Sequence, residues 1–201
     1  MRKITTSILS AAAVFVLFAV VGTDVQAQDA RPASPRGSSE TQIDGKWVAI
    51  DYGRPILRGR RSVFGSGDSY GKTVLSGADV WRLGANQSTQ LSTETPLHFG
   101  DHMVPAGDYT LFAELSATGW TLIVSNHTAK DNYGDAGDGL WGAYGYSADM
   151  DVARIPMTIA KMESSVDQFT IGFTDVTAAG GTLNIWWDDT AAKASFKTGD
   201  M

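Results

Sequence analysis

The chain has 201 residues, a formal net charge of −6 and no cysteine. This length favours one domain with a full hydrophobic core, and the lack of cysteine excludes disulfides, a thiolate nucleophile and cysteine-bound zinc. The acidic balance argues against nucleic acid or an anionic membrane as partner, because their phosphates require clustered positive charge.

The first 27 residues are typical of an export signal. Arg2 and Lys3 supply a positive start, residues 8–21 are almost entirely apolar, and residues 25–27 end in the small-x-small pattern of a signal-peptidase site. The apolar run is shorter than the roughly 20 residues of a membrane-spanning helix, although a retained anchor is the alternative. We therefore predict a signal peptide over 1–27, a flexible leader over 28–35, and a periplasmic or extracellular protein with no stable membrane span after cleavage.

Short alternating runs separated by Gly, Asp and Pro predict an antiparallel all-β domain over residues 36–198. Asp44-Gly45 predicts a hairpin, with Val48, Ile50 and Tyr52 on one face of its second strand. Further strands are predicted at residues 95–99, 102–104, 108–115, 120–125, 151–159, 168–173, 182–187 and 193–197. Eight to ten strands with short connections favour a single β-sandwich or jelly-roll-like domain.

Two connections are long and rich in Gly, Ser and Asp, at residues 62–78 and 126–139. Loops of this length on a rigid β scaffold often carry ligand contacts.

An arginine cluster provides the clearest functional signal. Four arginines lie within residues 54–61, and Trp81-Arg82 and Asn86 follow on the next segment. A guanidinium group grips carboxylates with two parallel hydrogen bonds, stacks on aromatic rings and bonds backbone carbonyls. The cluster thus has two interpretations that the sequence leaves open: loop clamps that pair with acids and carbonyls, or a cleft for an anionic or sugar-like molecule to which Trp141, Tyr144 and Tyr146 add stacking surface.

A serine motif and a histidine pair are weaker signals. Gly67 to Gly71 matches G-x-S-x-G around Ser69, but the flanks lack the strand and helix of a nucleophile elbow, and no histidine precedes the serine. His98 and His102 flank a predicted turn, where two histidines without a third ligand make a poor zinc site.

An acidic loop is a further alternative. Asp131, Asp135 and Asp138 share a glycine-rich loop with Asn132, and such oxygens could bind calcium, although the spacing of a helix-loop-helix calcium site is absent. A solvated acidic loop is the simpler interpretation. Asn86 and Asn126 begin glycosylation acceptor patterns, which matter only in a eukaryotic secretory compartment.

The order of motifs resembles a known family. "SPR", "YGRPILRGRRSVFG", "VWRLGAN", "VPAGDYTLF", "GWTLIVSN", "LWGAYGY", "DVARI" and "LNIWW" follow one another from Ser34 to Lys197. This succession resembles the exported bacterial family catalogued as domain of unknown function 2911. The resemblance implies a small β-sandwich behind a signal peptide and supplies no activity.

The family blocks contain most of the arginine cluster. The matching residues are Tyr52, Arg54, Pro55, Gly59, Arg60, Phe64, Gly65, Trp81, Arg82, Gly84, Asn86, Pro105, Gly107, Tyr109, Trp141, Gly142 and Trp187. Arg61, the histidines and the loop at 131–138 lie outside the pattern. Residues 72–80 form a longer passage into "VWR" than the family pattern has.

Three functional hypotheses follow. The first is a non-enzymatic exported domain that binds a small polar or glycan-like ligand, or an envelope partner, through Tyr52, Arg54, Arg60, Trp81, Arg82, Asn86 and Trp141. The second is a hydrolase that uses carboxylates or a bound metal, and the third is a purely structural domain with arginine loop clamps. No catalytic residue, metal ligand or cofactor is assigned, and the oligomeric state stays open.

Overall fold

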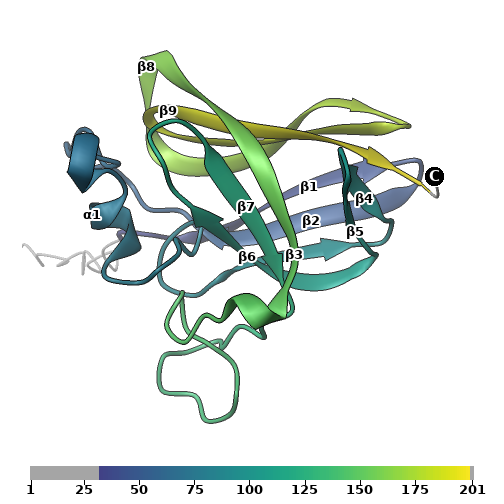
Figure 1. The fold of residues 1–201 in the computed structure, drawn as a ribbon, viewed down its shortest axis with the longest axis horizontal. Coiled ribbons are helices and arrows are strands. Elements are labelled where there is room, and N and C mark those ends of the chain that lie inside the picture. The colour runs from purple at the N-terminus through teal and green to yellow at the C-terminus, as the bar shows by residue number, and fades with distance from the viewer. Residues whose placement is uncertain (1–31, 200–201) are drawn as a thin grey trace, which may run out of the picture. The chain divides into compact units, whose positions relative to one another are not determined.

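The computed structural model describes residues 32–199, which form an antiparallel β domain (Figure 1). The strands are β1 (Arg36–Ile43), β2 (Lys46–Gly53), β3 (Thr89–Thr93), β4 (Leu97–Phe99), β5 (His102–Val104), β6 (Gly107–Glu114), β7 (Trp120–Ser125), β8 (Asp151–Thr177) and β9 (Gly180–Thr198). The helical elements are the short helix α1 (Lys72–Leu75) and two 3-10 turns, Gly67–Ser69 and Ala148–Met150.

The predicted signal peptide and residues 28–31 lie outside the described residues. The end of the predicted leader is held at the domain, because the carbonyls of Ala33 and Pro35 accept hydrogen bonds from the amides of Ile56 and Arg54. Within residues 32–199, no helix has the length and apolar character needed to span a bilayer.

All nine strands belong to one sheet, in the order β1-β2-β3-β6-β7-β8-β9-β4-β5. The first part of β8 pairs with β7, and its remainder pairs with β9. Register shifts between Lys161 and Thr170 bend β8 without ending it. The sheet therefore folds back on itself, and side chains of β1 and β2 bond to the backbone of β8. The predicted all-β sandwich is confirmed, with both layers drawn from one continuous sheet.

The bent strands correct part of the strand prediction. The predicted strands at 151–159 and 168–173 are both in β8, and those at 182–187 and 193–197 are both in β9. A bulge shifts the pairing register yet keeps the ladder going, so the polar residues between the apolar runs do not terminate the strand. β3 was not predicted, because its sequence TQLST has a single strongly apolar residue.

The predicted hairpins form where turn chemistry requires them. Asp44 and Gly45 have φ angles of 48° and 76°, as the tight turn between β1 and β2 demands. Val48, Ile50 and Tyr52 are buried while Trp47 is 47% exposed, which confirms the predicted alternation. The second hairpin joins β4 to β5 across Gly100 and Asp101.

The main core fills the space between the layers and is rich in aromatic rings. Trp81 lies at its centre, with ring centroids 5.1 Å from Phe169, 5.6 Å from Phe64 and 5.8 Å from Trp120. Edge-to-face pairs of this kind each contribute about 0.5–1.5 kcal/mol beyond the area that they bury. Of these rings, Trp81 also lines the cavity described below.

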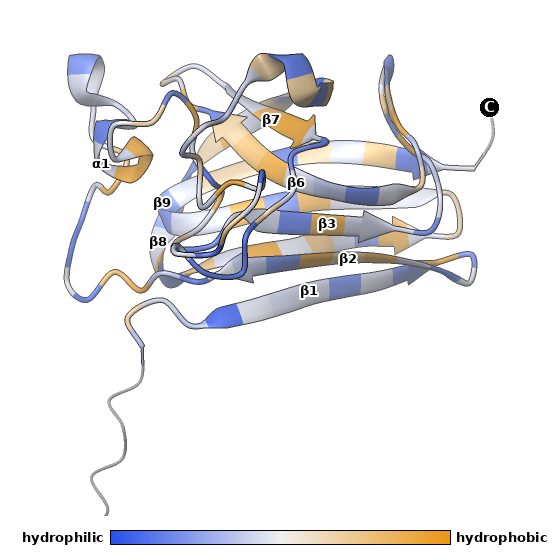
Figure 2. Cartoon of the chain, turned by 90° about the horizontal axis from the view of Figure 1, so that it is seen from below, coloured by the Kyte–Doolittle hydropathy of each residue, from blue (hydrophilic) through white to orange (hydrophobic). Residues whose placement is uncertain are grey.

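β6 and β7 are buried on both faces. Leu111 and Leu122 point into the main core, whereas Phe112 and Ile123 join a second cluster with Val80, Leu140 and Ala143. Figure 2 shows the hydrophobic colour along β7. The long connection after β7 covers this outer face, so part of its length serves packing.

Candidate functional site

One cavity of about 250 Å³ brings together four of the seven predicted site residues, namely Arg60, Trp81, Arg82 and Asn86. The other residues that line it are Ser34, Pro55, Thr73, Val74, Ser76, Gly84, Ala85 and Trp187. They come from the segment before β1, the segment after β2, the helix α1 with its C-cap, the loop before β3, and β9. Segments far apart in sequence thus form the site.

The arginine segment is held against β8. The amide of Phe169 donates to the carbonyl of Pro55 (2.9 Å), and the amide of Leu57 donates to the carbonyl of Asp167 (2.8 Å). Arg58 and Gly59 then take φ angles of 51° and 80°, which reverse the chain. A non-glycine residue at positive φ costs free energy, so the surrounding contacts must hold this turn in place.

The Arg60 guanidinium is oriented by its own turn. Its Nε donates to the carbonyl of Leu57 (3.0 Å), and its Nη2 donates to the carbonyl of Ile56 (2.9 Å). Its Cζ lies 5.7 Å from the ring centroid of Trp187. These contacts use two of the five N–H donors of a guanidinium and leave Nη1 without a hydrogen-bond partner within residues 32–199.

The loop at residues 81–86 is fixed from two sides. The backbone of Trp81 pairs with Ala113 of β6 through two hydrogen bonds of 2.8 Å. On the other side, a Cβ added to Gly84 would lie 2.5 Å from the carbonyl oxygen of Gly53. The loop therefore packs its backbone directly on the end of β2, an approach that only glycine permits.

The Arg82 guanidinium is positioned by the block at residues 141–144. Its Nη1 donates to the carbonyl of Asn86 (3.1 Å), and its Cζ lies 5.6 Å from the ring centroid of Tyr144. A Cβ added to Gly142 would lie 2.6 Å from Arg82 Nη1. Gly142 has a φ of 66°, so this position requires glycine for its backbone and leaves room for the guanidinium.

The cavity is electropositive. Among the described residues that line it, Arg60 and Arg82 are charged and none is acidic. Within residues 32–199, neither guanidinium lies within 4.0 Å of a carboxylate, since the ion pairs there involve Arg36, Arg154 and Lys161. Both cationic groups are therefore without a countercharge from the described part of the chain.

Trp187 adds a hydrogen-bond donor to this wall. It is 3% exposed, and its ring stacks on Trp81 with centroids 6.3 Å apart and planes at 10°. Its Nε1 is buried without an acceptor among residues 32–199. A buried N–H without a partner costs about 1–3 kcal/mol, so an acceptor bound here would relieve that cost.

The other three predicted site residues lie outside the cavity lining. Tyr52 is 1% exposed, and its hydroxyl bonds to both the amide and the carbonyl of Ile171. Arg54 donates to the carbonyl of Phe169 (3.4 Å) and to Thr170 Oγ1 (3.3 Å), which ties the end of β2 to β8. Trp141 is half-buried in the connection between β7 and β8.

The serine and histidine motifs have local structural roles. Ser69 ends a 3-10 turn and donates to the carbonyl of Ser66 (2.8 Å). His98 pairs with Met103 and His102 pairs with Phe99, so the two histidines point to opposite faces of the β4–β5 hairpin.

Two carboxylates of the acidic loop accept hydrogen bonds within the protein. Asp135 accepts hydrogen bonds from the amide and side chain of Asn132, and Asp131 accepts one from Gln87. Among the residues that the structure describes, no three His, Asp or Glu side chains are arranged to hold a metal.

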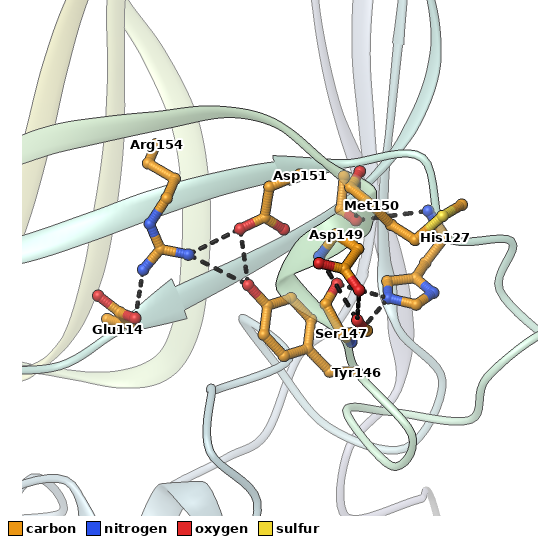
Figure 3. A network of polar contacts seen from close by, with 9 residues as sticks. Glu114, His127, Tyr146, Ser147, Asp149, Met150, Asp151 and Arg154 are labelled. Atoms are coloured by element: carbon orange, nitrogen blue, oxygen red, sulfur yellow. Dashed lines mark hydrogen bonds and ion pairs between the residues drawn. The ribbon is translucent and has the colours of Figure 1, made fainter.

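A separate polar network ties the β7–β8 connection to the sheet (Figure 3). Arg154 pairs with Glu114 and with Asp151 (2.7 Å), and the Tyr146 hydroxyl donates to Asp151 (2.7 Å). Burial and the neighbouring Asp151 carboxylate raise the pKa of Tyr146 to about 12, while the hydrogen bond to Glu114 leads the interactions that raise the pKa of Arg154. The Arg154 guanidinium thus bridges the carboxylates of Glu114 and Asp151, as in a structural ion-pair network.

Eight of the twelve residues that line the cavity were not predicted as site residues, and Trp187 and the residues of 72–80 show why. Trp187 belongs to the family block "LNIWW", but alternation alone does not show which of the two adjacent tryptophans faces the arginines. Thr73, Val74 and Ser76 lie in the stretch 72–80, where the only signal in the sequence was a predicted extra length relative to the family blocks.

The comparisons with known proteins agree with the resemblance seen in the motifs. The chain belongs to the family described as protein of unknown function DUF2911, whose sequence model matches residues 34–196. No match was found among curated proteins or among solved structures. The matched range includes every residue that lines the cavity.

Proposed function

We propose that this DUF2911 protein is a non-enzymatic binding protein that holds a small polar or glycan-like ligand in the cavity at Arg60 and Arg82. The observation that carries the proposal is the pair of guanidinium groups that line one cavity without a carboxylate partner among the described residues. A guanidinium that served only as a loop clamp would use its N–H groups on the protein, whereas Nη1 of Arg60 and both Nε and Nη2 of Arg82 have no partner within residues 32–199.

The volume indicates the size of the ligand. Pockets for drug-sized ligands measure about 300–1,000 Å³, and this cavity measures about 250 Å³. A molecule with the dimensions of a single sugar ring or a small organic acid is the expected occupant.

The predicted export signal gives the proposed compartment. We propose that the protein acts after secretion across the inner membrane, in the periplasm or outside the cell. Fractionation of cells that express the full chain, with mass spectrometry of the purified N-terminus, tests this: a start at residue 28 supports export, and an intact N-terminus in the cytoplasmic fraction contradicts it.

Thermal denaturation against a panel of sugars, sugar acids, amino acids and small organic acids tests the binding proposal. A ligand at one hundred times its Kd stabilises the folded state by about 2.7 kcal/mol, which raises the Tm by roughly 5–10 °C for a domain of this size. We expect at least one compound to produce such a shift with the wild-type protein.

Two arginine variants serve as the matched pair. Arg82→Gln should reduce the shift by about half or more, because Arg82 lines the cavity and a tenfold loss of affinity lowers the stabilisation from about 2.7 to about 1.4 kcal/mol. Arg61→Gln makes the same charge change at an exposed residue outside the cavity lining and should keep the shift. A panel without any shift, or a shift that Arg82→Gln leaves unchanged, contradicts the proposal.

A further inference from the structure

We infer that the ligand of this cavity is an anion, a small molecule with a carboxylate or phosphate group that binds Arg60, Arg82 and the indole N–H of Trp187. The inference rests on the proposed function and names the chemical class of its ligand. It is argued from the aromatic faces, the hydrogen-bond donors and the charge of the lining.

The tryptophan faces do not favour a neutral sugar. Carbohydrates bind tryptophan by laying a C–H face on an open aromatic ring. Trp81 is 1% exposed and is surrounded by four other aromatic rings. Trp187 stacks on Trp81 and also carries the Arg60 guanidinium over its ring. Both indoles are thus engaged with the protein, and neither offers the cavity an open stacking platform.

The donors that remain suit an oxyanion. Arg60 keeps its Nη1, and Arg82 keeps its Nε and Nη2, after their hydrogen bonds within residues 32–199. A guanidinium has no acceptor atom, and an indole has only its N–H. The functional groups of these three side chains are therefore donors only, and they bind acceptor oxygens. The strongest hydrogen bonds that they can form are charge-assisted bonds to a carboxylate or phosphate.

The indole of Trp187 points to the same chemistry by an independent route. Trp187 lines the cavity, and its Nε1 is buried with no acceptor among the described residues. Buried donors without a partner are rare in folded proteins, and an anion held by the arginines would supply the missing acceptor.

The two cations also lie in a protein of net charge −6. The local positive charge selects anions only at short range, because the Debye length is about 8 Å at physiological ionic strength. Binding of an anion should accordingly weaken as salt is added, whereas binding of a neutral sugar should not.

A matched ligand pair tests the inference by isothermal titration calorimetry on the protein expressed from the full chain. Glucuronate and glucose differ in a single carboxylate, and inorganic phosphate separates the two anion classes. We expect glucuronate or phosphate to bind at least tenfold more tightly than glucose, with an affinity that falls as sodium chloride rises. Equal binding of glucose and glucuronate would overturn the anion assignment and leave the proposed function standing.

Variants assign the contacts. Arg60→Gln and Arg82→Gln should each weaken anion binding by about tenfold or more, as the loss of a charge-assisted hydrogen bond does. Arg60→Lys keeps the charge but loses the planar fork and should weaken binding less than Arg60→Gln. Arg61→Gln should have the wild-type affinity, and anion binding that survives both glutamine variants would overturn the inference.

The indole contact has its own readout, which is measured on the wild-type protein. The Nε1–H resonance of Trp187, assigned by its loss in Trp187→Phe, should shift when the anion that binds is added to the wild-type protein. An unmoved resonance at saturation would remove Trp187 from the assignment. If none of the anions and none of the neutral panel compounds binds, this inference and the proposed function both fall.

Discussion

Replacing Tyr52 by phenylalanine should remove a polar link between the two layers of the sandwich. The Tyr52 hydroxyl donates to the carbonyl of Ile171 and accepts from its amide, each at 3.0 Å. The side chain is 1% exposed, so water cannot replace the hydroxyl. The substitution leaves the ring and its edge-to-face contact with Phe169 in place, which isolates the hydrogen bonds.

The expected cost follows from the two bonds. A hydrogen bond contributes about 0.5–1.5 kcal/mol net, and a buried group left without a partner costs about 1–3 kcal/mol. The Ile171 carbonyl keeps a bond from Ser39 Oγ, so the amide carries most of the penalty. We expect Tyr52→Phe to lower the free energy of unfolding by about 2–4 kcal/mol, or the Tm by roughly 5–15 °C.

Thermal and urea denaturation followed by circular dichroism measure this effect. Tyr109→Phe is the matched control, because its hydroxyl makes one hydrogen bond, to the carbonyl of Pro105 (3.1 Å), at a more exposed position. The control should cost at most about 1 kcal/mol. If Tyr52→Phe destabilises the protein no more than Tyr109→Phe, the hydroxyl does not hold the layers together and the reasoning is refuted.

Three further predictions concern the loops around the cavity and the polar network. Gly84→Ala should lower the free energy of unfolding by about 2–4 kcal/mol, because a Cβ would lie 2.5 Å from the Gly53 carbonyl oxygen. In the control Gly59→Ala the Cβ meets no atom within 4 Å, so the cost should be about 1 kcal/mol, for the positive φ alone. Similar denaturation curves for the two variants would contradict this. Arg154→Met should cost about 1–3 kcal/mol, because it leaves the 7%-exposed Asp151 carboxylate without its cation, and urea denaturation without loss of stability would refute that role. The pKa of Tyr146 is raised to about 12, so the folded state keeps a proton that the unfolded state releases near pH 10. The free energy of unfolding should therefore fall between about pH 10 and 12, and it should fall less in Tyr146→Phe. Identical pH profiles of stability for the wild type and the variant would exclude the effect.

The arginine cluster could be located in the sequence, but the role of each arginine could not be decided there. Arg54 and Arg60 both donate to backbone carbonyls, as the loop-clamp interpretation expects. Arg60 also lines the cavity with Arg82 and has no carboxylate partner within residues 32–199. Arg60 thus holds its loop and also lines the cavity, so the loop-clamp and the cleft interpretations both apply to it.

The all-β class and the hairpins could be predicted from the sequence, because their causes are local. Asp44-Gly45 accepts positive φ at both turn positions, and alternation in residues 47–52 places Val48 and Ile50 on the buried face whatever that face packs against. Bulges in β8 could not be predicted in this way, since they depend on the register with β9.

The site depended on tertiary structure. Tyr52 and Arg54 occur in the same motif as Arg60, yet Tyr52 and Arg54 tie β2 to β8 while Arg60 lines the cavity. Motif order gave no means to separate them, because the folding back of the sheet through β8 decides which side chains are enclosed. Cavity walls from residues 34, 55–60, 73–86 and 187 meet only after that fold has formed, since contacts between segments so distant in sequence have no local cause.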